Sequence, residues 1–394
     1  MKLWVKMIKR DVASKLLGLA NRFPIITIIG PRQSGKTTLA QSVFPLMPYA
    51  NLENPQTLQF AEDDPIGFIE QFPDGCIIDE VQRAPKILSV LQVVTDKKKV
   101  NGQFIITGSQ QFTLMESITQ SLAGRTFIVK LLPLSIQELN AADKLSPLNQ
   151  TLFQGFYPNI YSQYSIPSEL MQAYFDTYIQ KDVRQVINIK NTSLFQKFVG
   201  LCAGRIGQLL NKESLSNDLG INVKTVEEWI SVLETSFVLT RLQPFWRNTR
   251  KRLVKSPKIY FYDVGLASWL LRINSPETMA THPLRGHLFE NMIIMEAFKA
   301  RYNALKDNNL FFYRDGKKKE VDLIFDEGQS IFPIEIKSAA TYSSDFAKNF
   351  QAIEDLNPRE KAVILGSNDN QIRSELDIIS WKNFPEYMRK KNIL

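Results

Sequence analysis

The segment GPRQSGKT at residues 30–37 constrains the fold of this chain more than any other feature of its sequence. It matches the pattern GxxxxGKT and follows the apolar segment 24–29, which is short, rich in isoleucine and typical of a buried parallel strand. Helical spacing begins near Lys36, so the glycines lie in a strand-to-helix turn, which is the context of a phosphate-binding loop. We therefore expect an α/β domain that binds a nucleoside triphosphate.

Each residue type in this loop suits phosphate binding. The two glycines let the backbone curl, so that amide groups and the helix N-terminus face the phosphates. Lys36 would reach the β and γ phosphates of ATP, and the hydroxyl of Thr37 would ligate Mg²⁺. The alternative is an ordinary glycine-rich turn without a ligand. The residues predicted to bind the nucleotide here are Gly30, Pro31, Arg32, Gln33, Ser34, Gly35, Lys36, Thr37 and Thr38.

Two adjacent carboxylates follow the next apolar strand, in CIIDE at residues 76–80. Adjacent acids at a strand end are often only the start of a solvated loop. In the same domain as GPRQSGKT, however, Asp79 is predicted to support the magnesium ion through its water shell. Glu80 would then orient or deprotonate the water that attacks the γ phosphate.

Hydroxyl side chains end a further predicted strand, FIITGS at residues 104–109. Thr107 and Ser109 occupy the place at which an additional-strand ATPase senses the γ phosphate. Arg125 follows roughly one helix later. It is either a surface charge or an arginine finger that stabilises charge in the transition state.

Composition limits the remaining classes of protein. The length of 394 residues indicates two or three domains, and 44% hydrophobic with 22% charged residues is typical of a folded chain. A net charge of +8 favours polyanionic partners such as nucleotides, nucleic acids or anionic lipids. With only two cysteines and two histidines, a disulfide framework and a cysteine- or histidine-rich metal site are excluded. Magnesium held by oxygen ligands is the expected metal.

The sequence contains no apolar run near the ~20 residues that span a bilayer. The basic start MKLWVKMIKR alternates apolar and charged residues and lacks the apolar core of a signal peptide. We expect a cytoplasmic protein without membrane contact.

Three domains are predicted, with boundaries at 1–150, 151–275 and 276–394. The expected fold is α/β: a P-loop NTPase parallel-sheet sandwich, then a helical winged-helix region with long helices at 170–186 and 193–210, then a small α/β domain. Within 212–243, two short helices flank the turn at 219–222, the pattern of a helix-turn-helix.

The segment 245–258 carries six basic and no acidic residues. With Trp246 it would contact a DNA backbone through cations and an aromatic ring. A solvated hairpin, or a winged helix that binds protein, explains the same pattern.

The residues 320–337 are predicted to form a hairpin. With its turn centred on Glu327 and Gly328, Glu320 would oppose Glu335, and Asp322 would lie one diagonal step away on the same face. These carboxylates with Lys337 match the DxnExK pattern of metal-dependent nucleases, in which two acids hold Mg²⁺ and the lysine polarises the phosphate or its water. The alternative is an amphipathic hairpin with ordinary surface pairs.

A restriction-endonuclease-like fold typically adds a carboxylate from the preceding helix, and here Glu290 is that residue. Val321 stands where proline is usual, and Pro333 within a strand suggests an edge or a non-hydrogen-bonded site. The predicted ligands of a second metal are Asp322 and Glu335, and the predicted catalytic residues of this site are Glu290, Asp322, Glu335 and Lys337.

Taken in order, GPRQSGKT, IIDEVQRAP, ITGSQQF and SLAGR resemble a prokaryotic AAA-type P-loop ATPase family with a C-terminal domain of unknown function (4143). The resemblance covers nearly the whole chain. It implies ATP and Mg²⁺ as cofactors, ATP hydrolysis by Lys36 and Glu80, and a winged-helix plus restriction-endonuclease-like C-terminal region. In AAA-type enzymes the finger acts across a subunit boundary, which would give Arg125 its role in a homo-oligomer. The alternative function is a nucleotide-switched module that binds DNA or protein and has a vestigial nuclease fold.

Overall fold

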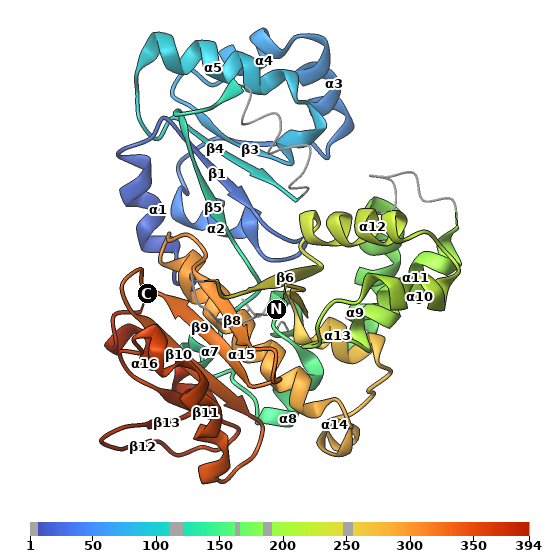
Figure 1. Ribbon diagram of the computed structural model, residues 1–394. Coiled ribbons are helices and arrows are strands. Elements are labelled where there is room, and N and C mark those ends of the chain that lie inside the picture. The colour runs from blue at the N-terminus through green and yellow to red at the C-terminus, as the bar shows by residue number, and fades with distance from the viewer. Residues whose placement is uncertain (1–6, 110–120, 162–165, 184–190, 247–254, 394) are drawn as a thin grey trace. The chain divides into compact units, whose positions relative to one another are not determined.

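The computed structural model (Figure 1) describes residues 7–109, 121–161, 166–183, 191–246 and 255–393. The described chain forms two compact units. The N-terminal unit contains the described residues up to Leu134 and the short segment Thr235–Phe237, and the C-terminal unit contains the rest. No helix within the described ranges is long and apolar enough to cross a bilayer.

The N-terminal unit is built on a parallel sheet of five strands in the order β2-β3-β4-β1-β5. In Figure 1, α1 and α2 lie on one face of this sheet and α3, α4 and α5 on the other. The strands are β1 (Ile25–Ile29), β2 (Tyr49–Asn51), β3 (Cys76–Asp79), β4 (Phe104–Gly108) and β5 (Thr126–Lys130). The helices are α1 (Ala13–Ala20), α2 (Lys36–Val43), α3 (Pro55–Asp63), α4 (Pro65–Glu70) and α5 (Lys86–Lys98).

The central strand β1 explains why this sheet forms. All five of its residues, IITII, are buried, as expected for a strand covered on both faces. Its parallel neighbours β4 and β5 end at the same edge of the sheet, at Gly108 and Lys130. The predicted strand at 24–29, the start of a helix at Lys36 and the α/β class are confirmed.

The C-terminal unit begins with helices. The first turn of α7 (Ile136–Ala141) is held inside this unit, because the amide of Ile136 donates to the buried carboxylate of Glu296 at 2.8 Å. The predicted helix 170–186 is in fact α9 (Pro167–Tyr174) continued by the π-helix η3 (Phe175–Val183), and the predicted helix 193–210 ends early as α10 (Thr192–Ala203). A further helix, α8, spans Leu148–Gln154.

The turn predicted at 219–222 lies between α11 (Lys212–Leu219) and α12 (Val223–Thr235). Gly220 ends α11 in the left-handed conformation at φ 65°, where glycine is favoured. The strands β6 (Leu239–Pro244) and β7 (Lys258–Phe261) then pair antiparallel. Most of the basic segment 245–258 falls at 247–254, outside the described residues, so its predicted hairpin and DNA contact stay predictions.

The C-terminal unit contains a mixed sheet of eight strands, ordered β12-β13-β11-β10-β9-β8-β6-β7. The last two strands, β6 and β7, belong to the predicted helical region. They join this sheet because β6 pairs with β8 at Gln243 and Pro244. The other strands are β8 (Leu310–Arg314), β9 (Glu320–Asp326), β10 (Ile331–Lys337), β11 (Ala362–Leu365), β12 (Gln371–Ile372) and β13 (Asp377–Ser380). The helices are α13 (Val264–Leu270), α14 (Pro276–Thr281), α15 (Arg285–Asn303) and α16 (Phe384–Lys390), with the 3₁₀ segment η4 at Ser344–Leu356.

The β9–β10 hairpin forms as predicted, but its predicted register is wrong by two residues. Ile331 pairs with Asp326 and Ile334 with Leu323, so the same ladder places Glu335 opposite Asp322 rather than Glu320. The cause is a four-residue loop, closed by the amide of Glu327 donating to the carbonyl of Ser330 at 3.1 Å. A shift of two residues keeps every side chain on its predicted face.

Of the two positions predicted for Pro333, the sheet edge is wrong, because β10 lies between β9 and β11, and the position without a ladder hydrogen bond agrees with the pairing to β11. The parallel ladder with β11 begins only at Ile334, so proline's missing N–H breaks no rung of that ladder.

Candidate functional site

The predicted phosphate loop lies between β1 and α2. At Gly30 a Cβ atom would lie 2.1 Å from the carbonyl oxygen of Leu131, so a larger residue cannot occupy this position. Gly35 precedes α2 in the left-handed conformation at φ 90°, and Gln33 is also left-handed at φ 60°. The loop therefore has the sharply curled backbone that aims amides at a bound anion.

Lys36 is 5% exposed and folds back onto this loop. Its Nζ donates to the carbonyl of Gly30 at 3.0 Å and to that of Pro31 at 2.8 Å. Burial lowers the pKa of Lys36 to about 8, although Glu80 and Asp79 partly oppose the shift. Lys36 is thus a buried cation whose Nζ is bound by two loop carbonyls.

Other parts of the loop are held from outside the motif. Arg10 donates to the carbonyl of Ser34 at 2.7 Å and to that of Leu132 at 2.6 Å, and so ties the loop to the end of the sheet. The hydroxyl of Ser34 is buried and has no hydrogen-bond partner among the described residues. Sequence reasoning missed Arg10, because a single arginine in a basic stretch carries no motif.

Asp79, at the end of β3, is brought together with Thr37 and Thr107. Thr37 Oγ1 donates to Asp79 Oδ2 at 2.8 Å, and Thr107 donates to Asp79 Oδ1. Tyr49 Oη also donates to Asp79 Oδ2, at 2.7 Å. Tyr49, like Arg10, has no sequence motif to identify it.

Glu80 adopts the left-handed conformation at φ 56°, which is uncommon for a residue with a side chain and clusters at functional sites. Its Oε2 accepts a hydrogen bond from Ser109 Oγ at 2.9 Å and another from Gln82 Nε2. The predicted sensor residue Ser109 therefore contacts the predicted base directly. Gln82 is an additional partner that the sequence did not indicate.

Magnesium fits the oxygen set at this loop. Thr37 and Asp79 present a hydroxyl and a carboxylate in mutual contact, the hard oxygen donors that Mg²⁺ prefers. The Thr37 hydroxyl donates its hydrogen bond to Asp79, so the lone pairs of the hydroxyl oxygen remain available to a cation.

Arg125 is not brought to this loop. It immediately precedes β5, and its carbonyl accepts from the amide of Ile25 at the start of β1, whereas the loop follows the end of β1. Five residues of strand separate the two ends, roughly 16 Å. The guanidinium is bound instead to Asp96 on α5, at 2.6 and 2.8 Å. Its position excludes contact with the phosphate site of its own chain, so the finger role stays a prediction that needs a second subunit.

The C-terminal carboxylates form a compact cluster on β9 and β10. Lys337 Nζ donates to Asp322 Oδ2 at 2.9 Å and to Glu335 Oε2 at 2.5 Å. The amide of Ile336 also donates to Asp322 Oδ2, at 2.8 Å. Glu335 is fully buried, and burial together with the neighbouring Asp322 raises its pKa well above the usual value.

Glu290 on α15 is held by a different cation. Its Oε1 accepts from Lys258 Nζ at 2.9 Å and from Tyr260 Oη at 2.5 Å. Lys258 also pairs with Glu320 at 2.6 Å, and Arg314 pairs with the other oxygen of Glu320 at 3.0 Å. Lys258 was expected in the exposed basic segment for DNA. This is wrong, because Lys258 is 2% exposed and serves as a counter-ion inside the protein.

The residues of this ion-pair cluster do not fit a divalent metal in the described structure. We define the cluster as Lys258, Glu290, Arg314, Glu320, Asp322, Glu335 and Lys337. Three cations face four carboxyl groups, one of which, Glu335, is biased toward its neutral form. Among the described residues, no group of three or more His, Cys, Asp or Glu side chains could hold a metal ion. The lysines neutralise the acids that a metal would otherwise bind.

The raised pKa of Glu335 leads to a prediction about stability. Because folding favours its protonated form, the group lowers stability as the pH rises above its usual value of 4.5. Glu335→Gln is therefore expected to increase the free energy of unfolding at pH 8 by on the order of 1 kcal/mol, with little effect at pH 5. Chemical denaturation in a chelating buffer measures this, with the exposed Glu375→Gln as the control. An equal change at both pH values would contradict the assigned protonation state.

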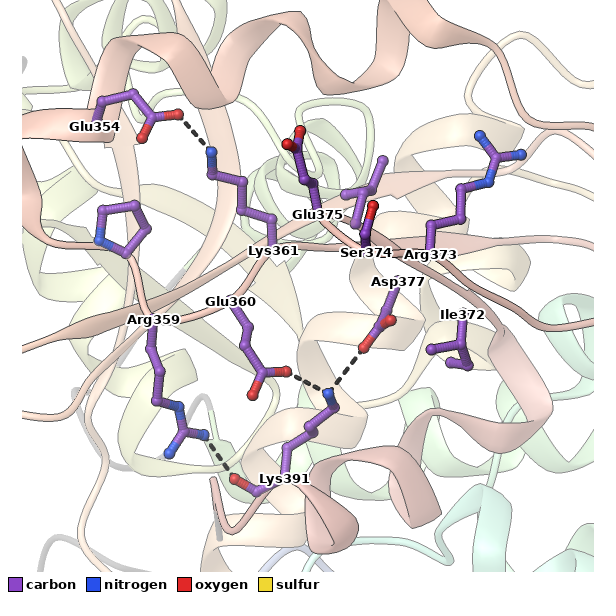
Figure 2. Close-up of a pocket in the computed structure, with 12 residues that line it drawn as sticks. Glu354, Arg359, Glu360, Lys361, Ile372, Arg373, Ser374, Glu375, Asp377 and Lys391 are labelled. Atoms are coloured by element: carbon purple, nitrogen blue, oxygen red, sulfur yellow. Dashed lines mark hydrogen bonds and ion pairs between the residues drawn. The ribbon is translucent and has the colours of Figure 1, made fainter.

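Two of the cavities in the C-terminal unit are lined by aromatic or charged side chains. One, of about 810 Å³, has Phe175 and Trp269 among its lining residues. The other, of about 540 Å³, is lined by four acidic and four basic side chains, several of which are paired in Figure 2. Lys391 binds Glu360 and lies 3.0 Å from Asp377. Because its charges balance, the second cavity has no net charge to attract an ion.

Three family models match the chain in order. An AAA domain matches residues 22–140, a domain of unknown function (DUF8612) matches 146–277, and another (DUF4143) matches 285–384. The AAA domain and DUF4143 were both expected from the resemblance.

Relatives extend the similarity along most of the chain. The uncharacterized protein Rv2008c of Mycobacterium tuberculosis is 30% identical over 342 residues, which span 85% of this chain and 75% of that protein. The uncharacterized protein Mb2031c of Mycobacterium bovis matches with the same values. Among solved structures, the Walker-type ATPase of Pyrococcus abyssi has a TM-score of 0.46 at 13% identity, covering 67% of this chain and 96% of the other.

Proposed function

The chain belongs to the same family as the mycobacterial proteins Rv2008c and Mb2031c, and on this premise we propose that it is an AAA-type ATPase that hydrolyses ATP with Mg²⁺. The observation that carries the proposal is the arrangement at the carboxyl end of the parallel sheet. There a curled glycine loop, a buried lysine and the pair Thr37–Asp79 lie beside Glu80.

In the proposed reaction, a water oxygen forms a bond to the γ phosphorus and the bond from that phosphorus to the β–γ bridging oxygen breaks. Glu80 accepts the proton that the water loses. Lys36 leaves the loop carbonyls and places its charge against the β and γ phosphates. Bound at Thr37, with Asp79 behind it, Mg²⁺ would supply charge neutralisation on the phosphate oxygens.

The hydrogen bonds that Glu80 accepts must change before it can take a proton from water. Its Oε2 is occupied by Ser109 and Gln82, so at least one contact must change before this oxygen takes a proton. Thr107 and Ser109 are suited to link that change to the γ phosphate, because they contact Asp79 and Glu80 respectively. As a finger, Arg125 would act on a neighbouring subunit of a homo-oligomer.

For the C-terminal unit, the alternatives are a metal-dependent nuclease and a binding module with a vestigial nuclease fold. The ion-pair cluster favours the binding module. The cluster's acids are paired with lysine and arginine, and a nuclease needs them open to a metal. DNA remains the proposed partner of the basic segment, in which Trp246 is 54% exposed and Lys255 is exposed. Loss of DNA affinity on neutralising Arg250, Lys251 and Arg252 would support this contact.

Lys36 provides the direct test of nucleotide binding. Because phosphates would raise its pKa from about 8, ATP binding is expected to take up a proton above pH 8 and none at pH 6. Lys36→Met should abolish the uptake and weaken ATP binding roughly 10- to 100-fold, the loss expected for charge-assisted hydrogen bonds. Calorimetry in two buffers of different ionisation enthalpy measures both quantities.

The exposed Lys97→Met is the matched control for Lys36→Met and should behave like the unsubstituted chain. If the unsubstituted chain does not bind ATP with Mg²⁺ present, the proposed function is wrong.

A further inference from the structure

Asp79 receives hydrogen bonds from three different elements of the N-terminal unit. Thr37 comes from α2, Thr107 from β4 and Tyr49 from β2. Asp79 is 6% exposed, so little water is available to replace a missing donor. Its orientation is therefore set by these three side chains.

Tyr49 occupies an unusual place among the three donors. It begins β2, the edge strand of the sheet, and pairs with Ile77, two residues before the pair that joins Asn51 to Asp79. Its side chain extends along the strand to reach the carboxylate at 2.7 Å. Tyr49 is 38% exposed, so its ring is not part of the buried core, and the contribution that we consider is the hydrogen bond of its hydroxyl.

The distribution of donors between the two carboxylate oxygens gives Tyr49 a specific effect. Oδ1 accepts from Thr107, whereas Oδ2 accepts from both Thr37 and Tyr49. With Tyr49 in place, Asp79 Oδ2 stays directed at Thr37 and continues to accept the hydrogen bond that the Thr37 hydroxyl donates. The lone pairs of the Thr37 hydroxyl are then held in one direction, away from the carboxylate.

We propose that Tyr49 is a positioning residue for the Mg²⁺ that accompanies the nucleotide, acting through Asp79 on the hydroxyl of Thr37. The inference rests on the proposed function. It assigns Tyr49 no contact with the metal or the phosphates. Removing the phenol oxygen leaves the glycine loop and Lys36 untouched, so the loss should fall on the contribution of magnesium and not on phosphate binding as such.

The test compares equilibrium binding of ATP with excess Mg²⁺ and with a chelator, in the unsubstituted chain and in Tyr49→Phe. We expect the factor by which Mg²⁺ strengthens ATP binding to fall roughly five- to tenfold in Tyr49→Phe, less than for full loss of one hydrogen bond to a charged group, because Thr37 and Thr107 still bind the carboxylate. Affinity without Mg²⁺ should stay the same.

Tyr387→Phe is the matched control, because Tyr387 Oη donates to Asp377 Oδ2 at 2.8 Å in the C-terminal unit. It removes an equivalent tyrosine–aspartate bond and should leave the magnesium factor unchanged. Thermal unfolding of each variant without nucleotide reports any general loss of structure.

The outcomes separate this inference from the proposed function. If the unsubstituted chain binds ATP but Tyr49→Phe keeps the full magnesium factor, the positioning role is wrong and the proposed function stands. Equal losses with and without Mg²⁺ would likewise overturn it, because they indicate a general effect on the loop. If the unsubstituted chain binds no ATP at all, both fail together.

Discussion

Glu80→Gln is expected to lower the rate of ATP hydrolysis by about 10²- to 10⁴-fold, the usual contribution of a general base, while ATP remains bound. The amide has the shape of the carboxylate, and its oxygen can still accept the hydrogen bond that Ser109 donates at 2.9 Å. It cannot take a proton from water near neutral pH. The fold and the phosphate loop should therefore survive, and the variant should trap ATP. Single-turnover phosphate release together with equilibrium ATP binding measures the two effects separately.

Glu62→Gln is the control for this change, because Glu62 is an exposed residue of α3 in the same unit. It should hydrolyse ATP at the unsubstituted rate. Unchanged turnover in Glu80→Gln, with normal ATP binding, would show that another group accepts the proton. Reduced ATP binding to the same extent as turnover would instead indicate that Glu80 supports the loop rather than the chemistry.

The features predicted well from sequence are those determined by neighbouring residues. A run such as IITII and the glycines of GPRQSGKT specify a strand and a turn locally, and both form where expected. The β9–β10 hairpin shows the limit of prediction from neighbouring residues. The alternation of side chains gave the correct faces, but the length of the loop decides the register, and a four-residue loop moved Asp322 opposite Glu335.

Contacts between distant segments could not be predicted where no motif marks the residues. Arg10 braces Ser34 and Leu132, and the latter is 122 residues away. Lys258 appeared to be one of six exposed cations, yet it is bonded to Glu290 on a helix that begins 27 residues later. A charge in a sequence does not reveal its partner, so a buried ion pair and a basic surface look alike until the chain is folded.

Lys258→Met is expected to destabilise the C-terminal unit by about 3–5 kcal/mol at pH 7, because it leaves the buried carboxylate of Glu290 without its lysine. Lys258 is 2% exposed and lies 2.9 Å from Glu290 and 2.6 Å from Glu320. Methionine fills a similar volume, so the loss is electrostatic rather than a cavity. Denaturant unfolding followed by far-UV circular dichroism measures the change. The exposed Lys255→Met should shift stability by less than about 0.5 kcal/mol.

The pH dependence identifies the cause of that loss. Burial alone would raise the pKa of Glu290, but Lys258, together with His287 and Tyr260, outweighs burial and holds it well below 4.5. A lowered carboxyl pKa stabilises the fold above the usual value and ceases to do so as the pH falls through the lowered one. The deficit of Lys258→Met should therefore shrink as the pH is lowered toward 4, where Glu290, without its lysine, gains a proton. A constant deficit across this range would mean that packing, not charge, is lost.

The same variant tests whether the C-terminal unit is a binding module with a vestigial nuclease fold or a metal-dependent nuclease. If Lys258 takes the place of a metal, Mn²⁺ should raise the melting temperature of Lys258→Met and leave the unsubstituted chain unchanged, because only the variant lacks the lysine that pairs with Glu290 and Glu320. Adding Asp322→Asn to the variant should weaken the response. Conversely, stabilisation of the unsubstituted chain by Mn²⁺ that disappears in Asp322→Asn would restore the metal-dependent nuclease interpretation. The ion pairs would then be a resting arrangement that the metal displaces.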